Sequence, residues 1–287
     1  MDATLFVSVI IPTYHDWDRL KLSLNALAQQ SYPADRFEVI VVNNDPEDQP
    51  PYVVANGNVR LLAEAKPGSY AARNAAIRVA KGEIFAFTDS DCIPDNGWLS
   101  KGIADLLKTD ADVISGAIDV FKEPNTTWAA WKYESIVAFR QHSREYPGAV
   151  TANLISWRGA FEDVGLFNER AYSGGDSEWT KAAREIGKVV AKSGALVNHP
   201  ARNSINSIMK RNRRVLGGRL LRADSKTEVL KIMLNLLIPP FRAIRIWRLS
   251  GASWFDCTIA FTLRSAIKCA CLPEAVNHIR STKLKND

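Results

Sequence analysis

The chain contains few cysteines, and their spacing suits neither a disulfide framework nor a zinc site. Four cysteines occur among 287 residues: Cys92, Cys257, Cys269 and Cys271. They form no Cys-x-x-Cys pair and none of the ligand spacings typical of structural zinc. This pattern excludes a small disulfide-stapled fold and predicts reduced thiols in a cytosolic protein.

Other common signatures are also missing. Residues Met1–Thr4 do not resemble the basic start of a signal peptide. The apolar run Leu5–Ile11 is short and ends at Pro12, which favours a first strand over a leader. No internal repeat or low-complexity segment is present. The absence of Gly-x-Gly-x-x-Gly leaves dinucleotide binding poorly supported.

Lysine and arginine are concentrated towards the C-terminus. Residues 200–287 carry 17 Lys and Arg against 5 Asp and Glu, whereas residues 1–199 have a net charge of −6. This asymmetry predicts a mildly acidic body and a basic tail whose partner is an anionic surface. The tail's cations alternate with aliphatic stretches rather than with stacking aromatics, so we expect no nucleic-acid partner.

Strand and helix patterns alternate along the first part of the chain. Strands are expected at Phe6–Ile11, Phe37–Val42, Val59–Leu62, Ile84–Phe87, Val113–Val120, Val150–Trp157 and Val189–Val197. The intervening helices are expected after Asp16, after Gly68, at Asn96–Lys108, at Trp128–Arg144 and at Asp176–Ile186. This order predicts an α/β fold with a mostly parallel central sheet flanked by helices. The length fits one such domain plus an appendage.

The last part of the chain, residues 224–287, has a different character. Its apolar stretches are Glu228–Pro239, too short to span a bilayer, and Ala252–Leu272. The second contains three charged residues that fall on one side of a helix, which makes it amphipathic. Three alternatives stay open: these helices pack on their own domain, lie on an anionic membrane surface, or cross the membrane.

Two carboxylates follow one of the buried strands. The apolar run Ile84–Phe87 ends at Asp89 and Asp91, which places both side chains at the carboxyl edge of the sheet, where open α/β folds bind ligands. Paired hard oxygen ligands suit Mg²⁺ or Mn²⁺, and such an ion would hold a diphosphate. The pattern therefore implies a nucleotide-activated substrate.

A Gly-Ser helix start supports the same interpretation. Gly68 precedes a helix whose first backbone N–H groups favour a negative charge. Arg73 and Asn74, one turn further on, are within reach of diphosphate or ribose oxygens. The alternative is an ordinary capped helix with a solvent-facing arginine.

Taken in order, these segments resemble the inverting glycosyltransferase family 2. The resemblance covers about residues 5–220 and depends on the following segments: Val9–Tyr14, Val42–Asp45, Gly68–Asn74, Thr88–Asp91, Arg158–Phe161, Val164–Phe167 and Gly174–Glu178. It implies a Rossmann-like GT-A catalytic domain at residues 1–223, with a donor half at about 1–120 and an acceptor half at about 121–223. A basic, amphipathic helical appendage would then occupy residues 224–287.

The resemblance also implies a donor and metal site. Asp91 would ligate Mn²⁺ or Mg²⁺ directly, Asp89 would contact the metal, a metal-bound water or the ribose, and His199 is either a third ligand or a structural histidine. The remaining donor contacts would come from Pro12, Tyr14, Asn43, Gly68, Arg73, Asn74 and Ser90. The family commonly has an aspartate where this chain has Asn43, and an amide cannot act as an anion towards a base. The identity of the base therefore stays open.

The resemblance places the catalytic base at Asp176. A sugar hydroxyl must lose its proton as it attacks the anomeric carbon, and attack opposite the leaving group inverts that centre. The chain departs from the family's acidic Glu-Asp motif, because the first position is Gly175; Glu178 either compensates or caps the helix. Trp157, Arg158, Gly175, Glu178 and Trp179 would form the acceptor side, although Trp179 fits a core position equally well.

We therefore expect transfer of a single sugar from a nucleoside-diphosphate sugar to a hydroxyl acceptor, because the Gln-x-x-Arg-Trp motif of processive synthases is absent. The acceptor is expected to be a cell-envelope glycan or a lipid-linked glycan, used at the inner face of the cell membrane. Two rivals stay open. A nucleotidyltransferase usually has an early Gly-rich loop with a basic residue, which residues 12–20 do not offer, and a non-catalytic nucleotide-sugar-binding protein would lack the base or the metal pair.

Overall fold

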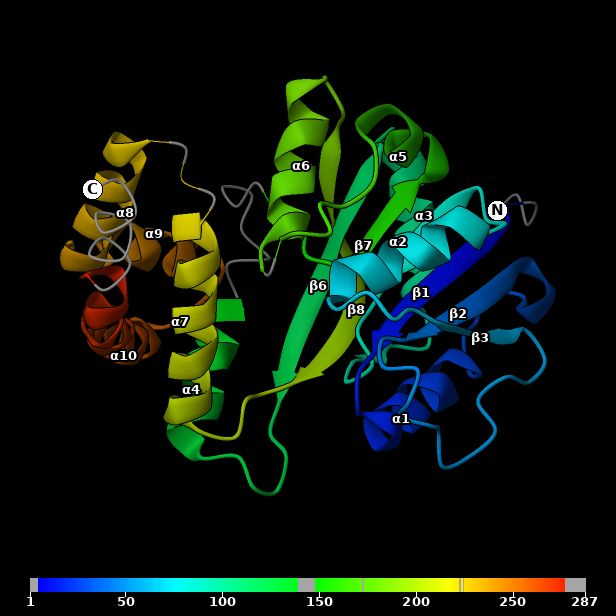
Figure 1. Ribbon diagram of the computed structural model, residues 1–287, viewed down its shortest axis with the longest axis horizontal. Coiled ribbons are helices and arrows are strands. Elements are labelled where there is room, and N and C mark those ends of the chain that lie inside the picture. The colour runs from blue at the N-terminus through cyan, green and yellow to red at the C-terminus, as the bar shows by residue number, and fades with distance from the viewer. Residues whose placement is uncertain (1–4, 139–147, 172, 222, 224, 277–287) are drawn as a thin grey trace. The chain divides into compact units, whose positions relative to one another are not determined.

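The computed structural model describes residues 5–138, 148–171, 173–221, 223 and 225–276. Its centre is a sheet of eight strands in the order β3-β2-β1-β4-β7-β6-β8-β5 (Figure 1). The strands are β1 (Val7–Thr13), β2 (Phe37–Asn43), β3 (Val59–Ala63), β4 (Ile84–Phe87), β5 (Ile93–Pro94), β6 (Val113–Phe121), β7 (Leu154–Trp157) and β8 (Val190–Pro200). The α/β fold predicted from the sequence is therefore present.

The strand directions change part-way across the sheet. β1 pairs parallel with β2 and with β4, and β3 pairs parallel with β2. Every residue of β1 and β2 is buried, as expected for parallel strands covered by helices on both faces. From β7 onwards the picture changes, because β7 runs antiparallel to both β4 and β6, and β5 runs antiparallel to β8. The parallel arrangement thus covers only the first half of the sheet.

Two apolar layers cover this sheet. Successive residues of β1 point to opposite faces. Val9 and Ile11 pack with helices α1 (Trp17–Leu27) and α3 (Trp98–Lys108). Ile10 faces the other layer, which contains residues of α2 (Ser69–Val79), α5 (Arg158–Val164) and α6 (Gly175–Glu185). Helices α2 and α6, which bear site residues, are therefore held by the same hydrophobic layer.

The chain divides into two compact units. Unit 1 comprises residues 1–119, 147–171 and 175–200, and unit 2 comprises residues 120–146, 172–174 and 201–287. The division does not follow the predicted boundary at residue 223, because residues of α4 (Trp128–Ala138) and α7 (Ile205–Leu221) share a core with the C-terminal helices. The assignment of residues 1–223 to a catalytic domain stays a prediction.

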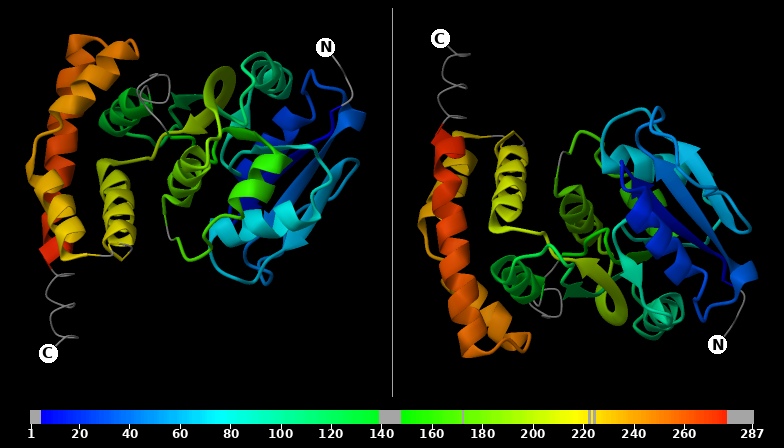
Figure 2. Two further views of the ribbon diagram at one scale, coloured as in Figure 1. Left: turned by 90° about the horizontal axis from the view of Figure 1, so that it is seen from above. Right: turned by 90° about the horizontal axis from the view of Figure 1, so that it is seen from below.

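Unit 2 is helical. Its C-terminal helices are α8 (Lys226–Leu237), α9 (Phe241–Leu249) and α10 (Trp254–Ala270), and α10 packs against α4, α8 and α9 (Figure 2). The helical character predicted for the tail is confirmed at α8, α9 and α10, whereas α7 was missed because arginines interrupt its apolar pattern. Residues 139–144 of the predicted helix Trp128–Arg144 lie outside the described residues. No helix in the described ranges is long and apolar enough to cross a membrane.

Candidate active site

The two carboxylates of the strand-end motif lie directly after β4. A turn closes there, with the Cys92 N–H donating to the Asp89 carbonyl at 3.1 Å. Thr88 is fully buried, and its hydroxyl donates to the Ala152 carbonyl at 3.1 Å. The turn holds Asp89 and Asp91 at the carboxyl edge of β4, both partly exposed, in the place predicted from the sequence.

A group of four side chains at this edge has the composition of a cation site. One ligand atom each from Asp89, Asp91, Cys92 and His199 lies within 4.8 Å of the others. His199 reaches the group because β8 pairs with β5, where Asn198 lies opposite Ile93. Two segments separated by more than a hundred residues thus meet at one point.

The chemistry of the donors fits Mn²⁺ or Mg²⁺. The His199 Nδ1 atom lies 2.7 Å from the Pro200 carbonyl, which only accepts, so Nδ1 carries the proton. The other ring nitrogen, Nε2, lies on the side of Asp91, whose Oδ2 is 3.9 Å away. Burial, with the charges of Asp89 and Asp91, raises the pKa of the Cys92 thiol well above its ordinary value. Two carboxylates and one imidazole are therefore the donors that would hold a cation of the predicted class.

Arg73 is buried, so the alternative prediction of a solvent-facing arginine is wrong. Only 3% of it is exposed, and its Nη2 donates to the Asp89 carboxylate. Its Nη1 donates to the Ser69 carbonyl at 3.3 Å, while its Nε has no hydrogen-bond partner among the described residues. Arg73 therefore fixes one oxygen of Asp89 and offsets part of the negative charge of the carboxylate pair.

This pair gives an asymmetric prediction for stability. We expect Asp89→Ala to lower the free energy of unfolding by about 2–3 kcal/mol, because it leaves the buried Arg73 guanidinium without its counter-charge. Arg73→Met should cost less, since Asp89 is a third exposed and water can solvate its carboxylate. Urea denaturation of both variants and of the double variant is the measurement. Equal costs, or a double variant no more stable than Asp89→Ala, would contradict the asymmetry.

Asp176 occupies the first turn of α6, and three donors hold its carboxylate. Oδ1 accepts from the Ser177 N–H at 2.8 Å and from the Tyr70 hydroxyl at 3.3 Å. Oδ2 accepts from the Thr151 N–H at 3.2 Å. A carboxylate at a helix N-terminus is also favoured by the helix dipole. The side chain is thus oriented by three separate segments of unit 1.

Tyr70 and Thr151 were missed by sequence reasoning. Tyr70 is largely buried, and burial followed by the charge of Asp176 raises its pKa to about 12. It therefore keeps its proton at neutral pH and can donate to Asp176, while its oxygen accepts from the Asp176 N–H at 3.2 Å. The one sequence signal was the glycine at position 175, where the family motif is acidic.

Two chains of contacts join Asp176 to the carboxylate pair. The first runs through α2: Tyr70 bonds Asp176, and the Arg73 guanidinium, which bonds Asp89, lies 5.6 Å from the centre of the Tyr70 ring. The second runs through the turn before β7, where Thr151 bonds Asp176 and its neighbour Ala152 bonds Thr88. The predicted base and the predicted metal ligands therefore lie in one connected region of unit 1.

Several predicted donor residues have protein partners. The amide of Asn43 donates to the Asp48 carbonyl at 2.8 Å and accepts from the Asp45 N–H at 3.1 Å. Asn74 donates to the Phe167 carbonyl and accepts from the Phe167 N–H, at 2.8 and 3.1 Å. These amides hold neighbouring loops, and their contacts to a donor stay predictions.

The other predicted donor residues lie around the ends of β1 and β4 and the start of α2. Pro12 is buried within β1, whereas Tyr14, just after it, is 63% exposed. Ser90 is buried in the turn after β4. Gly68 has a φ of 118°, which favours glycine, and its N–H donates to the Asn44 side chain at 2.8 Å. A phosphate group would have to displace that bond to use the Gly68 N–H.

The structure does not bring Trp157 and Arg158 to this site. β7 runs antiparallel to β4, with Trp157 opposite Ile84 and Leu154 opposite Phe87. Trp157 and Arg158 therefore lie at the opposite ends of the strands from the carboxylates, at least about 10 Å away along β4. The Arg158 guanidinium donates to the Ala80 and Gly82 carbonyls, which gives it a structural role.

Trp179 is a core residue rather than a sugar platform. It is 3% exposed and stacks on Phe161 with ring centres 4.2 Å apart, and its indole N–H donates to the Gly165 carbonyl. Glu178 is exposed and accepts from Asn168 at 3.2 Å. Of the predicted acceptor-side residues, only Gly175 directly adjoins Asp176 and its contacts.

Comparison with known proteins decides the family. Residues 8–165 match the model of glycosyl transferase family 2. The chain belongs to glycosyltransferase family 2. It is therefore an inverting glycosyltransferase that uses a nucleotide-sugar donor, and the sequence-based prediction of family and enzyme class is confirmed.

Relatives of the family 2 enzyme include both sequences and solved structures. It is 36% identical to glycosyltransferase AglE of Haloferax volcanii over 77% of this chain and 75% of the relative. It is 29% identical to the Escherichia coli UDP-Glc:alpha-D-GlcNAc-diphosphoundecaprenol beta-1,3-glucosyltransferase WfgD over 40% of this chain and 46% of WfgD. The mannosyltransferase PcManGT of Pyrobaculum calidifontis, solved with GDP-Man and Mn²⁺, superposes with a TM-score of 0.64 at 19% identity and covers 97% of this chain and 88% of PcManGT. This last likeness confirms the GT-A fold.

Proposed function

We propose that Asp176 is the general base of sugar transfer and that Asp89, Asp91 and His199 hold the divalent cation. The observation that carries this proposal is the connection of Asp176 to Asp89 through Tyr70 and Arg73. A bound Mn²⁺ or Mg²⁺ supplies charge stabilisation to the departing nucleoside diphosphate. The metal ligands and the base then serve the two ends of one displacement.

The hydrogen bonds of Asp176 favour one of its two oxygens as the proton acceptor. Oδ1 already accepts two hydrogen bonds, from Tyr70 and from Ser177, whereas Oδ2 accepts one, from Thr151. A carboxylate oxygen has two lone pairs. Oδ2 therefore keeps a lone pair that can take the proton of the acceptor hydroxyl. The hydroxyl oxygen then attacks the anomeric carbon from the side opposite the diphosphate, and the configuration inverts.

A thermal-shift screen tests the donor class without knowledge of the acceptor. A panel of nucleoside diphosphates at about a hundred times their Kd should raise Tm by about 5 °C, and only with Mn²⁺ or Mg²⁺ present. The preferred diphosphate then selects the sugar donors for a hydrolysis assay. Turnover of nucleoside triphosphates alone would instead indicate a nucleotidyltransferase, and binding without turnover of any sugar donor would indicate a non-catalytic protein.

We infer that unit 2 attaches the enzyme peripherally to an anionic membrane surface, at the cytoplasmic face. Helices α8, α9 and α10 and the segments between them expose large apolar side chains: Leu230, Leu234, Leu237, Ile238, Phe241, Leu249, Trp254 and Phe255. Exposed arginines lie among them on α9, and the Arg248 guanidinium covers the Trp254 ring at 5.0 Å. Apolar side chains bordered by arginines are typical of helices that lie at the interface of an anionic bilayer.

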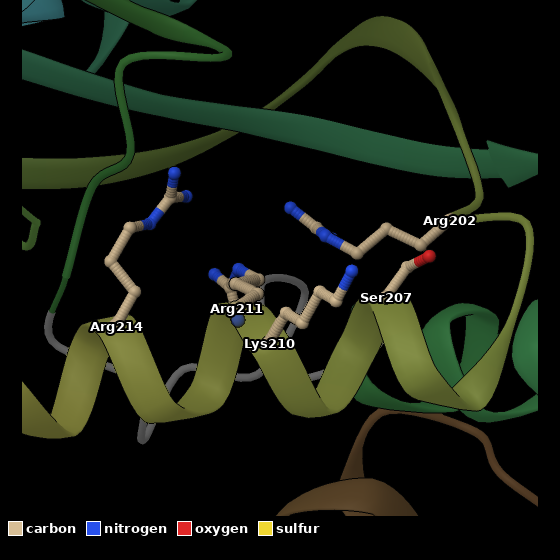
Figure 3. Close-up of a pocket in the computed structure, with 5 residues that line it drawn as sticks. All are labelled: Arg202, Ser207, Lys210, Arg211 and Arg214. Atoms are coloured by element: carbon tan, nitrogen blue, oxygen red, sulfur yellow. The ribbon is translucent and has the colours of Figure 1, made fainter.

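A basic pocket in the same unit supports an acceptor that carries a phosphate group. The pocket has a volume of about 330 Å³ and is lined by Arg202, Ser207, Lys210, Arg211 and Arg214 (Figure 3). Glu134 anchors Arg202 by accepting from its Nη1 at 2.6 Å and from its N–H at 2.7 Å. The lining itself contains no acidic side chain, and arginine forks match phosphate oxygens. A glycan linked to a lipid phosphate or diphosphate has this chemistry.

Vesicle binding tests membrane attachment through the exposed apolar side chains separately from lipid binding in the basic pocket. The double variant Leu237→Ser/Phe255→Ser should bind phosphatidylglycerol vesicles at least about tenfold more weakly than the parent, because it removes two exposed apolar side chains. Leu107→Ser, at a half-exposed leucine of α3 in unit 1, is the control and should bind as the parent does. Equal loss in both variants, or none in either, would contradict membrane attachment through unit 2.

The pocket is tested on the same vesicles doped with an isoprenyl diphosphate. Lys210→Gln/Arg214→Gln should lose the extra affinity that the diphosphate lipid gives the parent, about tenfold or more for two lost cations. Arg219→Gln, a cation of the same helix outside the pocket, is the control for general surface charge. Inorganic pyrophosphate should compete only with the doped vesicles. An identical response of all variants would show non-specific attraction instead.

A further inference from the structure

Gly175 is a glycine because of space rather than backbone conformation. A Cβ atom on this residue would lie 2.9 Å from Cε2 and 3.0 Å from Cζ of Tyr70, at or below the closest approach of real side chains. Gly175 is not among the glycines with positive φ, unlike its neighbour Gly174. The ring of Tyr70 therefore fills the space beside Gly175 that a side chain at this position of the family motif would need.

The ring of Tyr70 is firmly placed. Only 7% of the residue is exposed, and the ring packs against Phe167 with centres 5.6 Å apart. The guanidinium of Arg73, one turn further along α2, lies 5.6 Å from its centre. This packing directs the hydroxyl to Asp176, where it donates to Oδ1 and accepts from the backbone N–H. No other described side chain donates a hydrogen bond to the Asp176 carboxylate.

We propose that Tyr70 and Gly175 act as a coupled pair that replaces the acidic residue of the family motif and positions the base Asp176. The glycine leaves room for the ring, and the hydroxyl at the end of the ring holds Oδ1, so that Oδ2 faces the acceptor. Tyr70 is a positioning residue, because it acts through Asp176 and keeps its own proton. This inference rests on the proposed role of Asp176.

A phenylalanine at position 70 separates positioning from packing. Tyr70→Phe keeps the ring in its apolar layer and removes only the hydroxyl, so folding should be retained. We expect kcat to fall about tenfold with the KM for the donor unchanged within about twofold, since a misaligned base slows the chemical step only. Losing a donor to the charged carboxylate also disfavours its ionised form, so the acidic limb of the pH–rate profile should move to higher pH.

Tyr32→Phe is the matched control. Its hydroxyl is also partly buried and donates to a backbone carbonyl, that of Leu5, at 2.7 Å. The substitution removes one hydrogen bond from unit 1 without touching Asp176, so kcat and the pH profile should match those of the parent. Tyr70→Phe with the kinetics and pH profile of Tyr32→Phe would overturn the positioning role.

The coupling of the pair is tested without any activity. Gly175→Glu alone should lower Tm strongly, because its Cβ meets the Tyr70 ring, and Tyr70→Ser alone should lower Tm because it removes a buried ring. The double variant should lower Tm by clearly less than the sum of the two single changes, because the clash needs both side chains. Tm values of the parent, the two single variants and the double variant form a complete cycle. Additive Tm changes would contradict the coupling of Tyr70 and Gly175. Because this readout needs no substrate, a failure of the pair is distinguishable from a failure of the sugar-transfer proposal.

Discussion

Asp176→Asn is expected to lower kcat for sugar transfer by about a thousandfold. An asparagine keeps the size of the side chain and can still accept from the Ser177 and Tyr70 donors through its oxygen. It cannot take a proton at neutral pH, and general base catalysis contributes about 10²–10⁴-fold. The measurement is initial-rate kinetics of transfer to a hydroxyl acceptor, with Tm compared to the parent to confirm folding.

Glu178→Gln distinguishes the two acidic residues of the same helix turn. Glu178 is exposed, and its carboxylate accepts from Asn168, so its removal should change kcat by less than about threefold. Binding of the nucleoside diphosphate with Mn²⁺ should be unchanged in both variants, because neither residue belongs to the metal group. An Asp176→Asn enzyme with more than a tenth of the parent rate, or an equal loss in Glu178→Gln, would contradict the assignment of Asp176 as the general base.

Asp91→Asn is expected to lower metal-dependent transfer by about a hundredfold or more. The substitution removes one of the two carboxylates of the cation group, and charge stabilisation of a leaving diphosphate by a metal contributes several kcal/mol. Rates measured over a range of Mn²⁺ concentrations should show both a weaker apparent metal affinity and a lower plateau. Titration of Mn²⁺ by calorimetry gives the affinity independently of turnover.

Cys92→Ala tests the ligand assignment at the same place. The thiol belongs to the group of four, but burial raises its pKa and keeps it protonated. We therefore expect Cys92→Ala to bind Mn²⁺ within about twofold of the parent, whereas His199→Gln should weaken binding about tenfold. A larger loss of Mn²⁺ affinity in Cys92→Ala than in His199→Gln would show that Cys92, rather than His199, is the ligand.

Local features of the chain account for the candidate residues whose place in the fold was predicted. Asp89 and Asp91 follow a short apolar run, and such a run predicts a buried strand whose end lies at a sheet edge. Asp176 follows two glycines at the start of a helix pattern. Each of these positions depends on residues nearby in the chain, so periodicity and motif order were enough to place them.

Contacts between distant segments explain the misplaced residues. Trp157 lies at the wrong edge of the sheet for an acceptor contact because β7 runs antiparallel to β4, and strand direction leaves no trace in an apolar pattern. Trp179 was open between two roles because the first turn of α6 does not reveal what it faces; the structure places Phe161 against it. Tyr70 was overlooked because its partner Asp176 is 106 residues away.

By itself, the sequence determined the family, the α/β fold of the catalytic body, the strand-end carboxylates and the basic, amphipathic character of the tail. These properties depend on local composition and spacing, which a linear pattern records. Only the tertiary structure decided which side chains meet: His199 with the carboxylate pair, Arg73 with Asp89, and Tyr70 with Asp176 in the space left by Gly175. The physical reason is that hydrogen bonds and steric exclusion act over a few ångströms between segments whose approach depends on strand order and helix packing.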